Sequence, residues 1–195
     1  AKQLAEIDVL SGGRLRAGVG IGWNELEFDA LGQNFRNRAR RMEEQIALMR
    51  ELWSNELVTF EGEWHRIDDA GINPLPVQRP IPVWIGAFVT PAIRRAGRIA
   101  DGILLNPRVK PTEPDADSAI ENFRDAAEEA GRDPGTLGMD ATVFTENRGE
   151  NAIREEVEAW RERGASHLTV RTMTAGLATV RDHLNALEQA RKAVT

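Results

Sequence analysis

The sequence predicts an α/β protein built around a parallel β-sheet. Five short apolar segments typical of buried strands alternate with amphipathic helical segments along the 195 residues. The chain opens with a helical segment, Ala1–Leu10, and not with a strand. Each βα unit averages about 39 residues, so eight units would need roughly 310, which is within the range of barrels. Two architectures therefore fit the pattern: an open doubly wound sheet, or a (β/α)8 barrel that lacks about three N-terminal units.

The expected elements follow from hydrophobic periodicity. Strands are expected at Leu15–Gly20, Pro82–Ile85, Ile103–Leu105, Met139–Phe144 and His167–Val170. Helices are expected at Arg38–Trp53, Pro91–Ala100, Asp117–Ala130, Asn151–Arg163 and from Gly176 to about Ala193, the last with Leu177, Val180, Leu184 and Leu187 on one face. The segment between Trp23 and Asn37 is expected to be a loop.

One stretch interrupts the alternation. Leu57–Ile67 contains two short β-type runs around Glu61-Gly62, which indicates a hairpin, and a proline-dense extended segment follows. Residues 54–82 are therefore expected to form a β-hairpin and Pro-rich insertion within a single domain that spans residues 1–195.

Composition excludes several classes of function. The formal net charge is −6, which disfavours nucleic acid or an anionic membrane as the main partner. The chain contains no cysteine, so disulfides, thiolate nucleophiles and cysteine-ligated metal sites are excluded, and a cytoplasmic location is expected. It also has no apolar run long enough for a membrane span. Because the first residue is Ala1, we expect the sequence to be a processed or truncated product.

The first candidate binding segment is the glycine-rich turn from Gly18 to Asn24, directly after an expected strand. Its G-x-G-x-G spacing differs from the dinucleotide-binding G-x-G-x-x-G pattern. One interpretation is that the glycines simply let the backbone turn at the end of a strand. They can also let a flat ring approach the backbone, with Trp23 as a stacking face and Asn24 as a polar contact.

The second candidate segment is Gly86–Pro91, between an expected strand and an expected helix. Thr90 fits the N-cap position and Pro91 the first helical position, so free N–H groups and the helix dipole could bind a phosphate. Arg94, one turn further, could add a charge-assisted contact. A plain capped helix with a solvated basic face explains the same pattern.

No pattern of catalytic side chains stands out. The three histidines are isolated, no serine lies in G-x-S-x-G, and the acid pairs fall on helices as solvated faces, so no metal site is expected and the catalytic residues are not identified. An enzyme of this composition would take its reactivity from a cofactor.

Five segments in register resemble the bacterial luciferase-like family of flavin- or deazaflavin (F420)-dependent oxidoreductases. They are Leu10–Trp23, Arg38–Trp53, Val58–Trp64, Pro76–Gly86 and Ile93–Gly102. The resemblance implies a (β/α)8 TIM barrel of which this chain carries strands four to eight and lacks the N-terminal units. On this resemblance, we expect the chain to be a fragment of a longer protein.

The resemblance also implies a cofactor, F420 or FMN, at the C-terminal mouth of the barrel. Gly20, Gly22, Trp23 and Asn24 would lie beside the ring, while Gly86, Ala87 and Thr90 would hold the coenzyme phosphate through backbone N–H groups, with Phe88 and Arg94 at the same turn. Ile21 stands where luciferase-like members carry a phosphate-binding arginine. Trp23 stands about where some deazaflavin dehydrogenases carry a catalytic glutamate, which leaves Glu25 and Glu27 as candidates.

The function expected from this resemblance is hydride transfer at a flavin or deazaflavin ring, as an F420- or FMN-dependent oxidoreductase or monooxygenase acting on a small-molecule substrate, with a homodimer as the expected assembly. Two other readings stay open: a non-catalytic binding protein on a degraded barrel, and an open-sheet nucleotide-binding enzyme. The substrate is not readable from the sequence.

Overall fold

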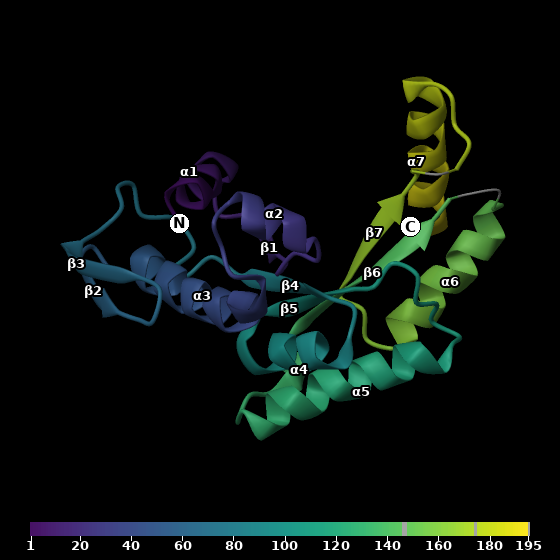
Figure 1. Ribbon diagram of the computed structural model, residues 1–195. Helices are drawn as coiled ribbons and strands as arrows, with labels where there is room; N and C mark the ends of the chain where they lie inside the picture. Colours follow the sequence, from purple (N-terminus) through teal and green to yellow (C-terminus); the bar gives the residue numbers. More distant parts are fainter. Residues whose placement is uncertain (146–147, 174, 195) are drawn as a thin grey trace. The chain divides into compact units, whose positions relative to one another are not determined.

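The computed structural model describes residues 1–145, 148–173 and 175–194. Strands form in all five expected places: β1 (Ala17–Val19), β4 (Val83–Ala87), β5 (Gly102–Leu105), β6 (Gly138–Phe144) and β7 (His167–Arg171) (Figure 1). Their order in the sheet is β1-β4-β5-β6-β7. This order follows the sequence without a reversal, whereas a doubly wound sheet reverses at its switch point. The open-sheet alternative is therefore wrong, and the order is that of successive strands in a barrel.

The chain divides into two compact units, Ala1–Trp84 and Ile85–Thr195. In the first unit, the long helix α3 (Arg38–Ser54) buries the apolar face that its periodicity predicts, with Met42, Ile46 and Trp53 inward. The hairpin is confirmed as an antiparallel pair of β2 (Val58–Glu61) and β3 (Arg66–Ala70). Leu48, Leu52 and Val58 form a small core beneath it.

Asp8, a buried carboxylate on helix α1 (Lys2–Ser11), ties together distant parts of the first unit. Its Oδ2 accepts a hydrogen bond from the Gln78 backbone N–H at 2.9 Å, and its Oδ1 accepts one from Gln78 Nε2 at 2.7 Å. The same Nε2 group donates to the Leu15 carbonyl oxygen at 2.8 Å. The buried charge is thus satisfied by donors from the Pro-rich segment, as a buried carboxylate requires.

Glu44, on helix α3, anchors the turn of the hairpin. Its carboxylate accepts backbone N–H bonds from Glu63 at 2.7 Å, Trp64 at 3.0 Å and His65 at 2.8 Å. The His65 Nδ1 atom lies 2.8 Å from the same carboxylate. Partial burial alone would raise the pKa of Glu44, but the bonds from His65, Trp64 and Glu63 together hold this pKa below its ordinary value.

Replacing Glu44 with glutamine should loosen the hairpin turn, because a carboxamide offers one acceptor oxygen where several donors converge. The native contribution is present above the ordinary glutamate pKa and is lost as the pH falls through the lowered native pKa. Hydrogen exchange at the Glu63, Trp64 and His65 amides measures this loosening. A Glu43→Gln variant on the same helix serves as the control, and equal amide exchange in the two variants would contradict the anchoring role.

The segment between Trp23 and Asn37 is helical in part, so the expected loop is wrong. It forms a short helix α2 (Glu25–Ala30) and a 3-10 turn η1 (Phe35–Asn37). The rings of Phe28 and Phe35 meet edge to face, with centroids 5.2 Å apart. A helix of six residues has little intrinsic stability, so this tertiary contact explains why sequence periodicity did not reveal it.

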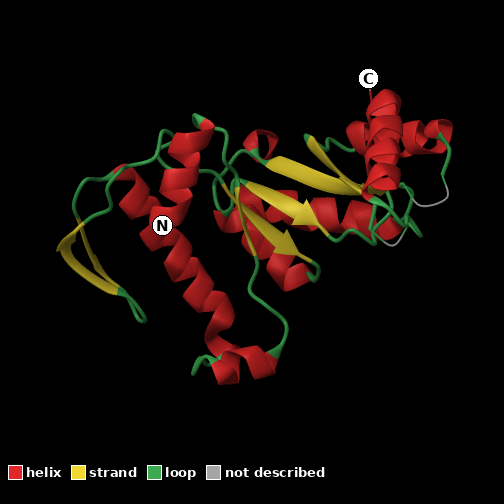
Figure 2. Ribbon diagram, turned by 90° about the horizontal axis from the view of Figure 1, so that it is seen from above, coloured by secondary structure: helices red, strands yellow, loops and turns green. Residues whose placement is uncertain are grey.

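In the second unit, helices α4 (Thr90–Ile99), α5 (Pro114–Glu129) and α6 (Glu150–Glu162) follow strands β4, β5 and β6, with a 3-10 turn η2 (Pro134–Thr136) before β6. Figure 2 shows the strands with the helices behind them. The β5–β6 and β6–β7 pairs are parallel. Strand β6 buries Met139, Asp140, Ala141 and Val143, and each helix contributes its own inward side chains. The core of this unit includes Ile85, Ile103, Met139, Val143, Ile93, Phe123, Ile153, Val157 and Trp160.

Helix α7 (Val180–Val194) begins later than the sequence predicts. Thr179 and Asp182 form a reciprocal cap: Thr179 Oγ1 donates to Asp182 Oδ2 at 2.7 Å, and the Asp182 N–H donates to Thr179 Oγ1 at 3.2 Å. The T-x-x-D spacing is the sequence signal for this start. The predicted apolar face is largely exposed, since Val180, Leu184 and Leu187 are 76%, 60% and 41% accessible. The side chains that α7 buries are the small Ala190 and Ala193.

Within the described residues, no helix combines the length and the apolar character needed to cross a membrane.

Candidate functional site

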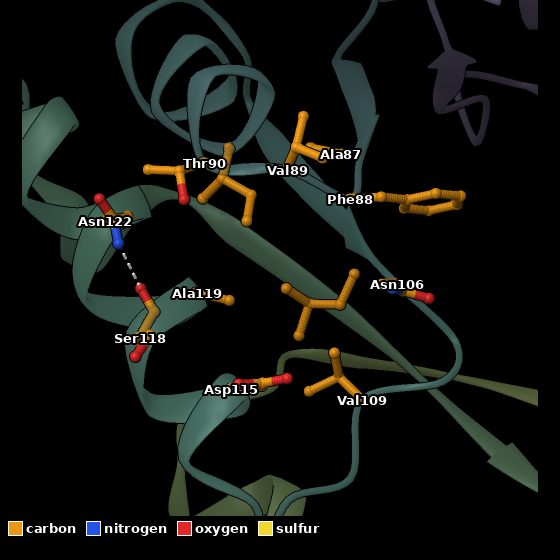
Figure 3. A pocket seen from close by; sticks show the side chains of 12 residues that line it. Ala87, Phe88, Val89, Thr90, Asn106, Val109, Asp115, Ser118, Ala119 and Asn122 are labelled. Carbon is orange, nitrogen blue, oxygen red and sulfur yellow. Dashed lines mark hydrogen bonds between the residues drawn. The ribbon is translucent and has the colours of Figure 1, made fainter. Parts of the chain in front are cut away.

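A cavity of about 320 Å³ lies in the second unit, at the carboxyl ends of β4 and β5 (Figure 3). Ala87 and Leu105, the last residues of these strands, contribute to its wall. The carboxyl ends of parallel strands are where α/β proteins place ligands. The other lining residues are Phe88, Val89, Thr90, Ile93, Asn106, Val109, Asp115, Ser118, Ala119 and Asn122.

Thr90 is the first residue of helix α4, so its expected N-cap role is wrong. Val89 is the N-cap, because its backbone is extended (φ −129°, ψ 150°), and no side chain caps the helix. The Val89 carbonyl oxygen accepts the N–H groups of Ala92 and Ile93 at 2.9 and 3.0 Å. Pro91 has no N–H group. Thr90 therefore carries the free N–H of the first helical turn, because no acceptor for it is present among the described residues.

The opposite wall of the cavity is polar and comes from helix α5. Asp115, Ser118 and Asn122 follow one another at spacings of three and four residues, which places them on one face of the helix. Asn122 Nδ2 donates to the Ser118 carbonyl oxygen at 2.7 Å. In Figure 3 the Asp115 carboxylate points toward Val109, and the Phe88 ring lies on the side away from α5. The cavity thus combines hydrogen-bonding groups with an apolar floor.

Of the residues that the sequence predicted at the phosphate turn, Ala87, Phe88 and Thr90 line this cavity. Gly86 lies within β4. Arg94 points elsewhere: its guanidinium lies 2.5 Å from the Glu129 carboxylate of α5, and it borders a separate hollow between α4 and α5.

The other predicted residues, Gly20, Gly22, Trp23 and Asn24, belong to the first unit. Gly22 has φ +74°, and a Cβ there would lie 3.0 Å from the Phe28 ring, so this position requires glycine. Trp23 is 86% exposed. Asn24 Nδ2 donates to Glu27 Oε1 at 3.0 Å, so one of the two candidate acids is partnered by a neighbour, while Glu25 lies beside it on α2.

Sequence reasoning missed Ser118 and Asn122, although the polar stripe of α5 is visible in their spacing from Asp115. The loop from Asn106 to Asp115 also contributes, because both of its end residues line the cavity. Among the side chains that the structure describes, no three His, Asp or Glu residues gather as metal ligands.

The fold and the cavity define a class: an α/β protein of the barrel type with a cavity at the carboxyl ends of its strands. The family model described as luciferase-like monooxygenase matches residues 1–195. The chain therefore belongs to the luciferase-like monooxygenase family, as the five-segment resemblance predicts.

Named relatives come from both coenzyme branches. The chain is 38% identical over 134 residues to an F420-dependent glucose-6-phosphate dehydrogenase of Nakamurella multipartita, covering 68% of this chain and 39% of that protein. It is 36% identical over 110 residues to an FMNH(2)-dependent dimethylsulfone monooxygenase of Pseudomonas putida, covering 54% of this chain and 30% of that protein. The chain thus spans less than half the length of these relatives.

A solved structure shows the same fold. The coenzyme F420 dependent tetrahydromethanopterin reductase from Methanopyrus kandleri superposes with a TM-score of 0.60 at 21% identity, covering 97% of this chain and 69% of that one.

Proposed function

We propose that this chain is the coenzyme-binding part of an F420- or FMN-dependent oxidoreductase that acts on a small-molecule substrate. The observation that carries the proposal is the cavity beside Thr90, at the carboxyl ends of β4 and β5, in a member of a family whose named relatives use these two coenzymes. Its volume of about 320 Å³ is within the range of small-molecule sites. When bound, the flavin or deazaflavin ring would supply the hydride chemistry.

The residues of the cavity suit the phosphate end of either coenzyme. The Thr90 N–H group lies at the positive end of the α4 dipole and would donate to a phosphate oxygen there, and the Thr90 hydroxyl would donate a second hydrogen bond. Gly86, Ala87 and Phe88 bring the backbone close to the same point. In this proposal Gly20, Gly22, Trp23 and Asn24 contact the ring, and Arg94 leaves Glu129 to approach the phosphate. Glu25 and Glu27 remain the candidate acids.

The finer sequence expectations also belong to this proposal. They are strands four to eight of the barrel, the insertion at 54–82, a homodimer and a cytoplasmic location.

A pair of Thr90 variants tests the phosphate site. Thr90→Ala removes the hydroxyl and keeps the N–H, whereas Thr90→Pro removes both and remains compatible with the first turn of a helix. Loss of a charge-assisted hydrogen bond costs about 1.5–3 kcal/mol, so Thr90→Pro should weaken coenzyme binding by roughly tenfold to a hundredfold, and clearly more than Thr90→Ala. Fluorescence titration of the native polypeptide with each coenzyme measures this. Equal coenzyme affinities of the wild-type and Thr90→Pro proteins would contradict phosphate binding at this turn.

A further inference from the structure

A second cavity, of about 450 Å³, lies at the rim of the second unit and is lined by Pro107, Arg108, Lys110, Phe144 and Arg148. We propose that Lys110, Arg148 and Arg171 bind a compact oxyanion, a phosphate or a carboxylate, of the substrate at this cavity. The proposal rests on the oxidoreductase function above and adds the chemical class of the substrate. These residues and Arg108 are called the rim cluster below.

The rim cluster occupies the position that parallel α/β folds reserve for ligands. Phe144 is the last residue of β6 and pairs in register with Arg171, the last residue of β7. Because strand side chains alternate, both lie on the sheet face opposite the buried Val143. Lys110 lies in the loop that follows β5. Three neighbouring strands therefore bring the cluster together at their carboxyl ends.

The Phe144 ring contacts two of these cations. Lys110 Nζ lies 4.8 Å and Arg171 Cζ 5.3 Å from the ring centroid. The electron-rich face of an aromatic ring favours a nearby cation without neutralising its charge. The Nε atom of Arg171 is buried and has no hydrogen-bond acceptor among the described residues. The protein therefore leaves part of the hydrogen-bonding capacity of the Arg171 guanidinium unused.

Glu156, a buried carboxylate on α6, fixes the other side of the cluster. It pairs with Arg148, and its Oε1 lies 3.5 Å from Lys110 Nζ. Arg148 Nη2 also donates to the Ala152 carbonyl oxygen at 2.5 Å, so this guanidinium is held by α6. Glu156 is therefore a positioning residue, because it orients two cations at the cavity wall.

The rim cluster has more positive than negative charges. The rim cluster contains four cations, and one buried carboxylate, Glu156, pairs with two of them, Lys110 and Arg148. The chain as a whole has a net charge of −6. Glu155 borders the adjoining cavity, which shares Lys110 and Arg148. A cavity walled by one sign of charge concentrates ligands of the opposite sign. Guanidinium and ammonium groups together match the oxygens of a phosphate or a carboxylate.

Calorimetric titration of the native polypeptide with inorganic phosphate, and separately with acetate, tests the rim cluster. Coenzyme is kept saturating, so that the cavity beside Thr90 is filled. Phosphate or acetate should bind with a Kd in about the millimolar range. Arg171→Gln and Lys110→Gln should each weaken binding at least roughly tenfold, from the loss of a charge-assisted contact. The anion that binds with the higher affinity then identifies the oxyanion group of the substrate.

The matched control is Arg161→Gln, which removes an exposed arginine of α6 that pairs with Glu158. It should leave anion binding unchanged. Equal weakening in the control and the rim variants, or no anion binding by a polypeptide that does bind coenzyme, would overturn the rim cluster as an anion site. Anion binding that depends on Lys110 in a polypeptide that fails to bind coenzyme would instead overturn the oxidoreductase proposal and leave the rim site standing.

Discussion

Replacing Asp8 with asparagine is expected to lower the free energy of unfolding by roughly 2–4 kcal/mol, because it disrupts a buried, charge-assisted network. Both carboxylate oxygens of Asp8 accept hydrogen bonds from Gln78, one from its backbone and one from its side chain. An asparagine offers one acceptor oxygen and one NH2 group. One Gln78 donor would then face another donor in a site without solvent access.

The same network makes this difference depend on pH. Burial alone would raise the pKa of Asp8, but the hydrogen bonds from Gln78 and neighbouring backbone groups outweigh burial, so the pKa lies below its ordinary value. A carboxyl group with a lowered native pKa stabilises the fold above its unfolded pKa and loses that contribution as the pH falls through the native pKa. The wild-type and Asp8→Asn proteins should therefore converge in stability in acid.

Urea unfolding over a pH series measures both effects. Glu6→Gln is the matched control. Glu6 is an exposed carboxylate on the same helix, and its Oε1 atom lies 3.8 Å from Lys2 Nζ. An exposed ion pair of this kind contributes about 0.2–1 kcal/mol at most. An Asp8→Asn variant as stable as Glu6→Gln at neutral pH would show that the Asp8 network does not hold the first unit together.

Replacing Gly97 with alanine is expected to destabilise the second unit by about 3 kcal/mol, the upper end of typical overpacking costs. A Cβ at Gly97 would lie 2.2 Å from the Phe123 carbonyl oxygen and 3.2 Å from the Ala126 Cβ. Helix α4 therefore approaches helix α5 more closely than any side chain would allow. The gain in helix propensity from alanine, about 1 kcal/mol, is too small to offset this contact.

This close approach also shapes the cavity, whose opposite walls are α4 and α5. Gly97→Ala should thus weaken coenzyme binding as well as lower stability. Gly149→Ala is the control, because a Cβ there meets nothing within 4 Å. Thermal unfolding and coenzyme titration of both variants measure the two effects. A Gly97→Ala protein that matches Gly149→Ala in both would contradict the proposed helix contact.

Several regular elements were predictable because their apolar residues recur at the period of a strand or a helix and are buried. The apolar spacing is clear for strand β6, with Met139 and Val143, and for helix α6, with Ile153 and Trp160. The structure confirms both elements. Helix α2 was not predictable, because it is short and depends on the contact between Phe28 and a later residue. Helix α7 starts later than expected because apolar Leu177 fits the helical period, whereas the cap formed by Thr179 and Asp182 sets the start at Val180.

The candidate site was predictable only in part. The turn before Pro91 has a local signal, and three of its predicted residues line the cavity. The partner of Arg94 comes from α5, 35 residues along the chain, and no local pattern reveals such a pairing. The rim cluster is similar: Lys110, Phe144 and Arg171 are separated by whole βα units, and the parallel sheet alone brings them to one edge.

Equilibrium titration of F420, and separately of FMN, into the native polypeptide tests the central claim most directly, with the absorbance and fluorescence of the coenzyme ring as the readout. A saturable change in the ring spectrum, with one of the two coenzymes bound at micromolar concentration, is the expected result. A ring spectrum that stays unperturbed by the polypeptide up to millimolar concentrations of both coenzymes would contradict it.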